Sequence, residues 1–132
     1  MRALLLIVLL LLATGANAVT VKIATLAPEG SGWMREMRAA ADQVKQQTEG
    51  RVEIRYYPGG VMGDDATVLR KIKLGQLQGG ALTGSEVSLI HKDAQIYSLP
   101  FLFSSYEQID AVRPQVDPLL KSSVGDKGFH VL

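Results

Sequence analysis

The 132-residue sequence contains no cysteine, only two histidines and no excess of charge of either sign. Without cysteine, the chain can have no disulfide framework, no thiolate zinc site and no thiol nucleophile. Residues 19–132 carry 13 basic and 13 acidic side chains. A neutral chain lacks the positive surface with which nucleic-acid binders neutralise phosphates. His91 and His130 are far apart and outside any metal-ligand spacing, so no metal site is expected.

Apolar residues are concentrated at the N-terminus, where residues 1–18 contain 14 of the 62 hydrophobic residues. Arg2 precedes an apolar run over 4–13, which is too short to cross a bilayer as a helix, since about 20 residues are needed. Small residues at Ala16 and Ala18 match a cleavage site, so residues 1–18 are predicted to be a Sec-type signal peptide cut after Ala18. An N-terminal membrane anchor is the alternative. The signal peptide predicts a soluble, exported protein, which in a Gram-negative cell is periplasmic and has no membrane anchor.

Alternating strand and helix patterns follow this apolar segment. They occur as a strand at 19–24, a helix at 33–48, a strand at 51–57, a helix at 66–74 and a weak strand at 78–83. Ser31 is expected to cap the first helix, and Asp64 or Asp65 the second, because the unpaired N–H groups there favour oxygen acceptors. Strands that alternate with helices predict one α/β domain with a mainly parallel sheet flanked by helices.

The last third of the sequence predicts helices and one more strand. A helical turn is expected at 86–91, and Ser104 with Glu107 resembles a capping box for a helix at 106–112. Pro114 is expected to break or restart that helix. Residues 129–132 have the composition of a strand, and because the sequence stops within it, we expect a truncated form of a longer protein.

No catalytic set is apparent in the sequence. Ser85 lies in TGSEV, which lacks the Gly-x-Ser-x-Gly elbow of serine hydrolases. The glycines of 79–85 match no dinucleotide or phosphate loop, although they would let a ligand approach the backbone. Asp64 and Asp65 form either an acid/base pair or helix caps. Trp33 either lines a ligand cleft after the first strand or lies in the core.

Four segments occur in an order and at a spacing that characterise one family. They are KIATLAPEGSGW at 22–33, YYPGGVMGDD at 56–65, LRKIKLGQLQGG at 69–80 and YSLPFLFSSYEQ at 97–108. Together they resemble the substrate-binding proteins of TRAP (tripartite ATP-independent periplasmic) transporters, the DctP-like family. The resemblance covers nearly all of residues 20–132.

The resemblance implies a type II periplasmic binding-protein fold with two lobes, of which residues 19–132 would be the N-terminal lobe, with the second lobe missing. It implies a solute-binding subunit that is not an enzyme and needs no cofactor. Such a subunit captures an organic anion, usually a carboxylate, and delivers it to a membrane permease driven by a sodium or proton gradient. In the family, an arginine of the second lobe pairs with the carboxylate, which suits a planar guanidinium. No residue of this sequence matches that arginine.

The resemblance also carries ligand contacts onto positions of this sequence. The substrate-binding residues it implies are Leu26, Ala27, Trp33, Asp65, Thr83, Gly84 and Ser85. Some members, such as the sialic-acid binders, have Asn and Glu at the positions of Leu26 and Thr83, so this sequence implies a less polar ligand. Two other functions stay open: the extracytoplasmic ligand-binding domain of a sensor, and an exported α/β enzyme, for which no nucleophile and base can be named.

Overall fold

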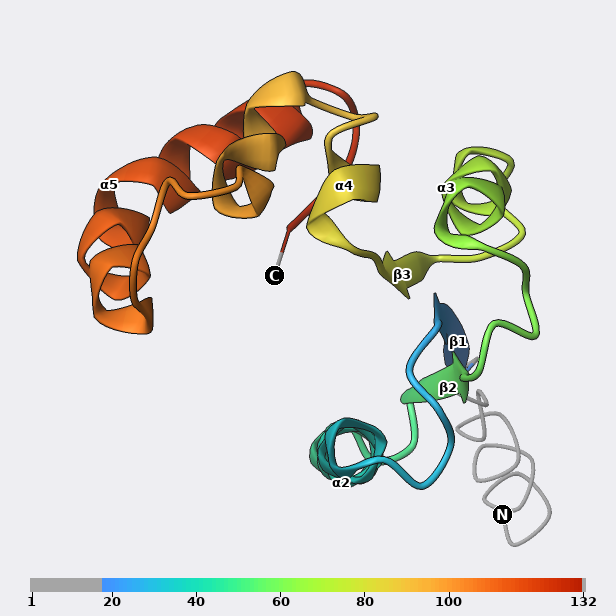
Figure 1. Ribbon diagram of the computed structural model, residues 1–132. Coiled ribbons are helices and arrows are strands. Elements are labelled where there is room, and N and C mark those ends of the chain that lie inside the picture. The colour runs from blue at the N-terminus through green and yellow to red at the C-terminus, as the bar shows by residue number, and fades with distance from the viewer. Residues whose placement is uncertain (1–17, 132) are drawn as a thin grey trace, which may run out of the picture.

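The computed structural model describes residues 18–131, which form a three-stranded sheet, helices against it and a largely helical C-terminal part (Figure 1). The elements in chain order are β1 Val19–Thr25, α2 Gly32–Gln47, β2 Val52–Tyr57, α3 Asp65–Lys73, β3 Gly79–Ala81, α4 Gly84–Val87, the 3-10 helix η1 Lys92–Ser98 and α5 Tyr106–Gly125. The predicted α/β order and parallel sheet are confirmed. Of the predicted signal peptide, residues 1–17 lie outside the described residues.

β1 is the central strand of the sheet, whose strand order is β2-β1-β3. β1 pairs in parallel with β2 from Val19 to Ala24, and with β3 only over its last three residues, which end at Thr25. In a parallel sheet the carboxyl ends of all strands lie at the same edge. The loops that follow β1, β2 and β3 therefore meet there.

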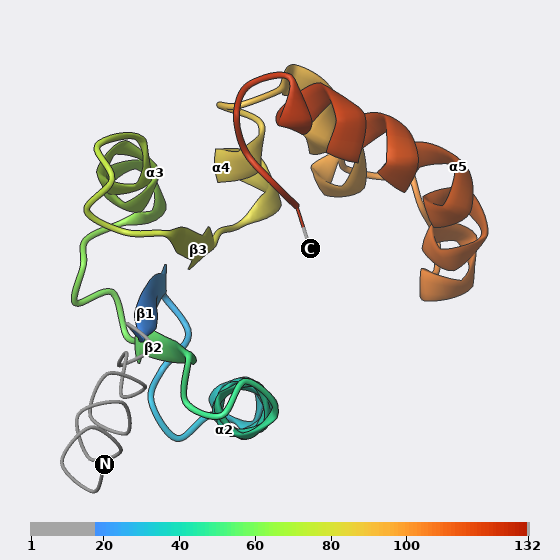
Figure 2. The ribbon, with the colours of Figure 1, turned by 180° about the vertical axis from the view of Figure 1, so that it is seen from behind.

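Helices α2 and α3 lie on opposite sides of the sheet (Figures 1 and 2). Met34 and Ala41 of α2 are buried, at positions that the helical spacing predicts for one face. Val68 and Leu69 of α3 are buried in the same way. The core cluster beside α3 consists of Ala24, Val68 and Leu77, with Tyr57, Met62, Ile72 and Leu82 packed against it.

Both predicted helix caps of the sheet region are present. The Ser31 hydroxyl accepts a hydrogen bond from the backbone N–H of Met34 at 3.2 Å. Of the two candidate aspartates, Asp64 is the cap of α3, and its Oδ1 accepts from the backbone N–H of Thr67 at 2.8 Å. Hydrogen bonds from the Thr67 side chain and backbone lower the pKa of Asp64. The carboxylate therefore stays charged where the helix dipole favours it.

Helix α5 corrects one prediction, because it continues unbroken through Pro114 and Pro118. A proline removes one N–H donor from a helix and leaves the carbonyl four residues earlier without its partner. Those carbonyls belong to Asp110 and Pro114, which are both exposed residues, so water can take the missing bond. The expectation that Pro114 breaks the helix is wrong for this reason.

Two further predictions in the C-terminal part are wrong. The N-cap of α5 is Ser105 instead of Ser104, and Gln108, in place of Glu107, reaches back to accept a hydrogen bond from the Ser104 N–H at 2.9 Å. Residues 129–131 form no strand, because none of the three strands described in residues 18–131 pairs with them. A strand needs a partner for its backbone groups, whatever its composition.

Candidate functional site

The candidate site lies at the carboxyl edge of the sheet, between the loops that follow β1 and β3. After β1 the chain turns towards β2, whereas β3 lies on the other side of β1. Such a change of direction is a topological switch point, where ligands of open α/β sheets bind. Leu26 directly follows β1, and Thr83 is the second residue after β3, so these two positions flank the switch point.

The loop after β1 is fastened to the loop after β2 through backbone groups. The carbonyl of Ala27 accepts a hydrogen bond from the Gly59 N–H at 2.9 Å, and that of Thr25 accepts from the Gly60 N–H at 3.1 Å. The N–H of Ala27 donates to the Thr25 hydroxyl at 3.1 Å. Both backbone groups of Ala27 are therefore bound within the protein, and this residue offers mainly its methyl group to a ligand.

Leu26 and Trp33 present apolar surface at this edge. Leu26 is 45% exposed, and Trp33, in the first turn of α2, is 43% exposed. The interpretation of Trp33 as a core residue is therefore wrong. A Cβ atom at Gly60 would lie 3.3 Å from Cδ2 of Leu26, so the leucine side chain rests against this glycine. Val61, the next residue, is 70% exposed.

Asp65 joins the start of α3 to the loop after β3. The residue is only 4% exposed, and its Oδ2 accepts a hydrogen bond from the Thr83 N–H at 2.9 Å. Its Oδ1 is buried and has no hydrogen-bond partner among residues 18–131. Because Asp64 caps α3 while Asp65 holds Thr83, the two carboxylates have separate structural tasks and do not act as an acid/base pair in this arrangement.

Thr83, Gly84 and Ser85 are exposed at the opposite side of the switch point. The hydroxyls of Thr83 and Ser85 lie 3.0 Å apart and share a hydrogen bond. A Cβ atom at Gly84 would lie 2.8 Å from Oγ of Ser98, so Gly84 allows η1 to approach α4. Gly84 therefore makes room for η1, and its role as a ligand contact stays a prediction. The structure brings this loop together with Asp65.

Sequence reasoning missed three residues that shape the edge. Gly60 supports Leu26, and Val61 adds an exposed apolar side chain. Nζ of Lys71 in α3 donates to the carbonyl of Met62 at 2.9 Å, which ties the end of the β2–α3 loop to the helix. The signal in the sequence was a large apolar residue, Val61, directly after two glycines that end a strand.

The arginines near the β1–α2 loop donate hydrogen bonds within the protein. Arg35 donates to the carbonyl of Gly30 at 2.6 Å. Arg38 forms a bidentate ion pair with Glu29, and this hydrogen bond lowers the pKa of the Glu29 carboxyl. Within residues 18–131, no three His, Asp or Glu side chains gather in a group that could hold a metal ion. None of the helices in that range is long and apolar enough to cross a membrane.

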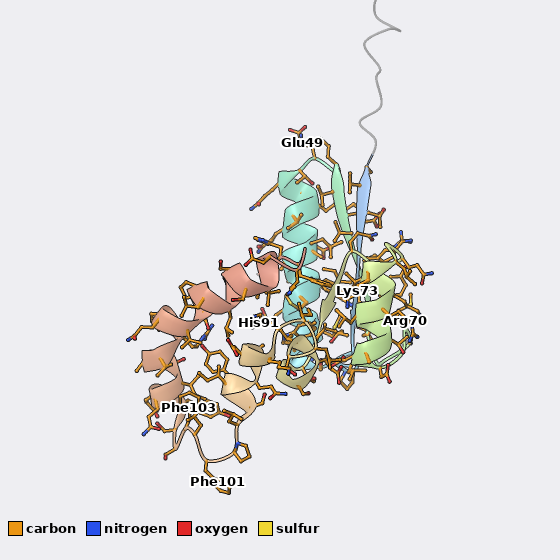
Figure 3. All side chains as sticks on the ribbon, turned by 90° about the horizontal axis from the view of Figure 1, so that it is seen from above. Glu49, Arg70, Lys73, His91, Phe101 and Phe103 are labelled. Carbon is orange, nitrogen blue, oxygen red and sulfur yellow. The ribbon has the colours of Figure 1, made fainter. Side chains whose placement is uncertain are left out.

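A second polar cluster ties η1 to α5, away from the sheet edge. The Tyr97 hydroxyl donates to Oδ1 of Asp117 at 2.6 Å, and Nε of Arg113 donates to the other oxygen at 3.2 Å. Burial and the bond to Asp117 raise the pKa of Tyr97 to about 12. The Tyr97 ring stacks on Phe103, with ring centroids 6.2 Å apart. Phe101, in the same loop, instead points away from the protein (Figure 3).

Comparison with protein families gives a match over most of this chain. A family model for DctP, the bacterial extracellular solute-binding proteins of family 7, matches residues 23–132. A curated solute-binding protein of Chromohalobacter salexigens is 30% identical over 99 residues, which are 74% of this chain and 30% of that protein. The chain therefore spans less than a third of the length of this relative.

Solved structures of similar fold include two TRAP periplasmic solute-binding proteins. The protein from Ochrobactrum anthropi matches with a TM-score of 0.75 and 27% sequence identity, and the match covers 86% of this chain and 36% of that protein. That structure has a C-terminus bound in its ligand-binding pocket. The protein from Sulfurospirillum deleyianum, solved with bound succinate, matches with a TM-score of 0.75 and 24% sequence identity. This match covers 86% of this chain and 37% of that protein.

Proposed function

Since the chain belongs to the DctP family of bacterial extracellular solute-binding proteins, we propose that it serves a TRAP transporter by capturing a small organic anion, a carboxylate, in the periplasm. The loaded protein then delivers this anion to a membrane permease. The fold is that of one lobe of a type II periplasmic binding protein, with a parallel sheet flanked by helices. The protein acts by binding and release and not as an enzyme.

The proposed domain boundaries follow from the N-terminal sequence and from the start of the sheet. Residues 1–18 would be a signal peptide removed after Ala18, and residues 19–132 the N-terminal lobe. β1 begins at Val19, whose backbone N–H donates to the carbonyl of Arg51 at 2.8 Å. The proposed cut would therefore leave the whole of β1 in the mature protein.

The observation that carries the proposal is the junction of two loops at the switch point of the sheet. Asp65 holds Thr83 in place there, and Leu26 lies exposed at the end of the neighbouring strand. A relative with the same fold binds succinate, a carboxylate. The residues proposed to face the ligand or to hold this face are Leu26, Ala27, Trp33, Asp65, Thr83, Gly84 and Ser85.

Each of these residues has a task that its position suggests. The hydroxyls of Thr83 and Ser85 would hydrogen-bond an oxygen of the ligand, since both residues are exposed. Leu26 and Trp33 would pack against its body. Asp65, being buried, would act through the Thr83 loop instead of touching the anion, which its own charge would repel.

The experiment is a thermal-unfolding screen of the protein expressed from its complete gene. We expect succinate or another carboxylate to raise the melting temperature, because a ligand that binds only the folded state stabilises it by mass action. The corresponding neutral amide, such as succinamide, should have no effect. If no carboxylate in a broad panel raises the melting temperature, the proposal is wrong.

A matched pair of variants tests the proposed polar contacts. Thr83→Ala should weaken binding of the stabilising carboxylate about fivefold to tenfold, the loss typical of one hydrogen bond. Ser122→Ala, which removes an exposed hydroxyl from α5, should leave the affinity unchanged. Uptake of the labelled acid into proteoliposomes that contain the permease should require the binding protein. Uptake without it would contradict the role in transport.

A further inference from the structure

Three large apolar side chains are exposed on the loops at the carboxyl edge of the sheet. Leu26 follows β1, Val61 lies in the loop after β2, and Trp33 lies in the first turn of α2. The loops that carry Leu26 and Val61 are joined by the hydrogen bond from Gly59 to Ala27. We call these three side chains the apolar face. Leu26 and Val61 lie on loops that are joined to each other, and Trp33 follows the first of these loops, so we treat the three as a candidate contact surface.

The contact between Leu26 and Gly60 keeps the leucine on this surface. Gly60 has a φ of +74°, a conformation that L side chains rarely adopt, and a Cβ atom there would come within 3.3 Å of Leu26. Glycine thus permits both the turn and the close approach of the leucine. Leu26 is held between the switch point and the β2–α3 loop, where it remains 45% exposed.

The cations of the neighbouring loops are already bound to oxygen atoms of the protein. Arg35 donates to Gly30, Arg38 is paired with Glu29, and Lys71 donates to Met62. Only Arg38 is engaged with a carboxylate, whereas Arg35 and Lys71 each hold one carbonyl oxygen of the fold. The side chains of the apolar face carry no charge themselves, so this face is matched to a part of the ligand that carries none.

From these contacts we propose that the apolar face binds a hydrocarbon part of the ligand. The substrate class is then a carboxylate with an aliphatic or aromatic body, as opposed to a polyhydroxylated sugar acid. This inference rests on the proposed binding function. Contact between Leu26 and a hydrocarbon removes apolar surface from water on both partners. A hydroxyl group placed against Leu26 would instead lose hydrogen bonds to water without replacement.

The experiment compares two acids of matched shape, cyclohexanecarboxylate and D-glucuronate, by calorimetry on the protein from its complete gene. Both present a six-membered ring with one carboxylate, and only the second carries hydroxyl groups. We expect cyclohexanecarboxylate to bind at least tenfold more tightly. If D-glucuronate binds as tightly or more tightly, the inference is wrong and the proposed function stands. If neither these two acids nor any other carboxylate binds, both are wrong.

Two variants locate the preference on the apolar face. Leu26→Asn should weaken binding of cyclohexanecarboxylate about tenfold, because about half of a leucine side chain loses its apolar contact. Its effect on D-glucuronate should be smaller. Leu74→Asn is the control, since Leu74 is also exposed but lies at the far end of α3. Melting temperatures of the unliganded variants establish that both fold. An equal loss for the two acids in Leu26→Asn would overturn the inference.

Discussion

The carboxylate of Asp65, at the start of α3, accepts a hydrogen bond from the backbone N–H of Thr83, 18 residues further along the chain, at 2.9 Å. This bond links the loop after β2 to the loop after β3 at the carboxyl edge. Asp65 is buried, so the bond is not exchanged freely for one to water. The bond therefore fastens the Thr83 loop, which also carries Ser85, to the start of α3.

Replacement of Asp65 therefore tests the linkage directly. Asp65→Ala should lower the free energy of unfolding by about 1–3 kcal/mol, because the Thr83 N–H loses its acceptor. Asp65→Asn keeps an acceptor oxygen of the same shape and should cost less. Urea denaturation of the three proteins gives the comparison. An alanine variant as stable as the parent would contradict a structural role for this bond.

Gly80 is expected to tolerate no side chain. A Cβ atom there would lie 2.8 Å from Cγ1 of Val68 and 3.1 Å from Cδ2 of Leu82, between β3 and α3. Gly80→Ala should lower the free energy of unfolding by about 1–3 kcal/mol through overpacking. Gly79→Ala is the matched control, since its Cβ would make only an ordinary contact with Ile23, at 3.5 Å. Equal stability of the two variants would contradict the close packing.

The Tyr97–Asp117 pair predicts a component of stability that is lost at alkaline pH. Burial and the Asp117 carboxylate raise the pKa of Tyr97 from 10.0 to about 12, so the folded state holds the phenol proton more tightly than the unfolded state. This contribution is complete below pH 10 and is lost as the pH rises towards about 12. Denaturation curves across this range should show the loss in the parent and its absence in Tyr97→Phe. Parallel pH profiles would refute the assignment.

Phe101 has a backbone conformation that glycine and asparagine adopt more readily than phenylalanine does. Its φ is +62°, in the left-handed region, and its side chain is fully exposed, so no contact within residues 18–131 compensates the strain. Phe101→Asn should raise the free energy of unfolding by about 1 kcal/mol, because asparagine tolerates this region. Leu102→Asn, at the next exposed position, provides the control. A less stable Phe101→Asn protein would show that the ring is needed.

Local rules in the sequence account for most of the secondary structure. Ser31 and Asp64 cap their helices because the acceptor and its donor lie within three residues of each other. The alternation at 19–25 and 52–57 and the apolar spacing in α2 and α3 are likewise properties of neighbouring residues. Such rules failed at Pro114, where exposure of the helix decided the outcome, and at 129–131, which lack a partner strand.

The candidate site was only partly predictable. Leu26, Trp33, Asp65 and the segment at 83–85 were assigned from the family resemblance, and their role as ligand contacts stays a prediction. The sequence could not show that Asp65 is buried or that Gly84 faces Ser98, because both depend on residues that fold back from elsewhere. Val61 was overlooked because a single exposed apolar residue has no periodic pattern.

By itself, the sequence determined the succession of strands and helices from β1 to β3, the caps of α2 and α3 and the family, because these follow from short-range periodicity and from ordered motifs. Only the tertiary structure decided that β1 lies between β2 and β3. It also decided that Asp65 holds Thr83 and that Leu26 rests on Gly60. The physical reason is that hydrogen bonds and packing between residues far apart in the chain form only when the sheet brings their loops to one edge.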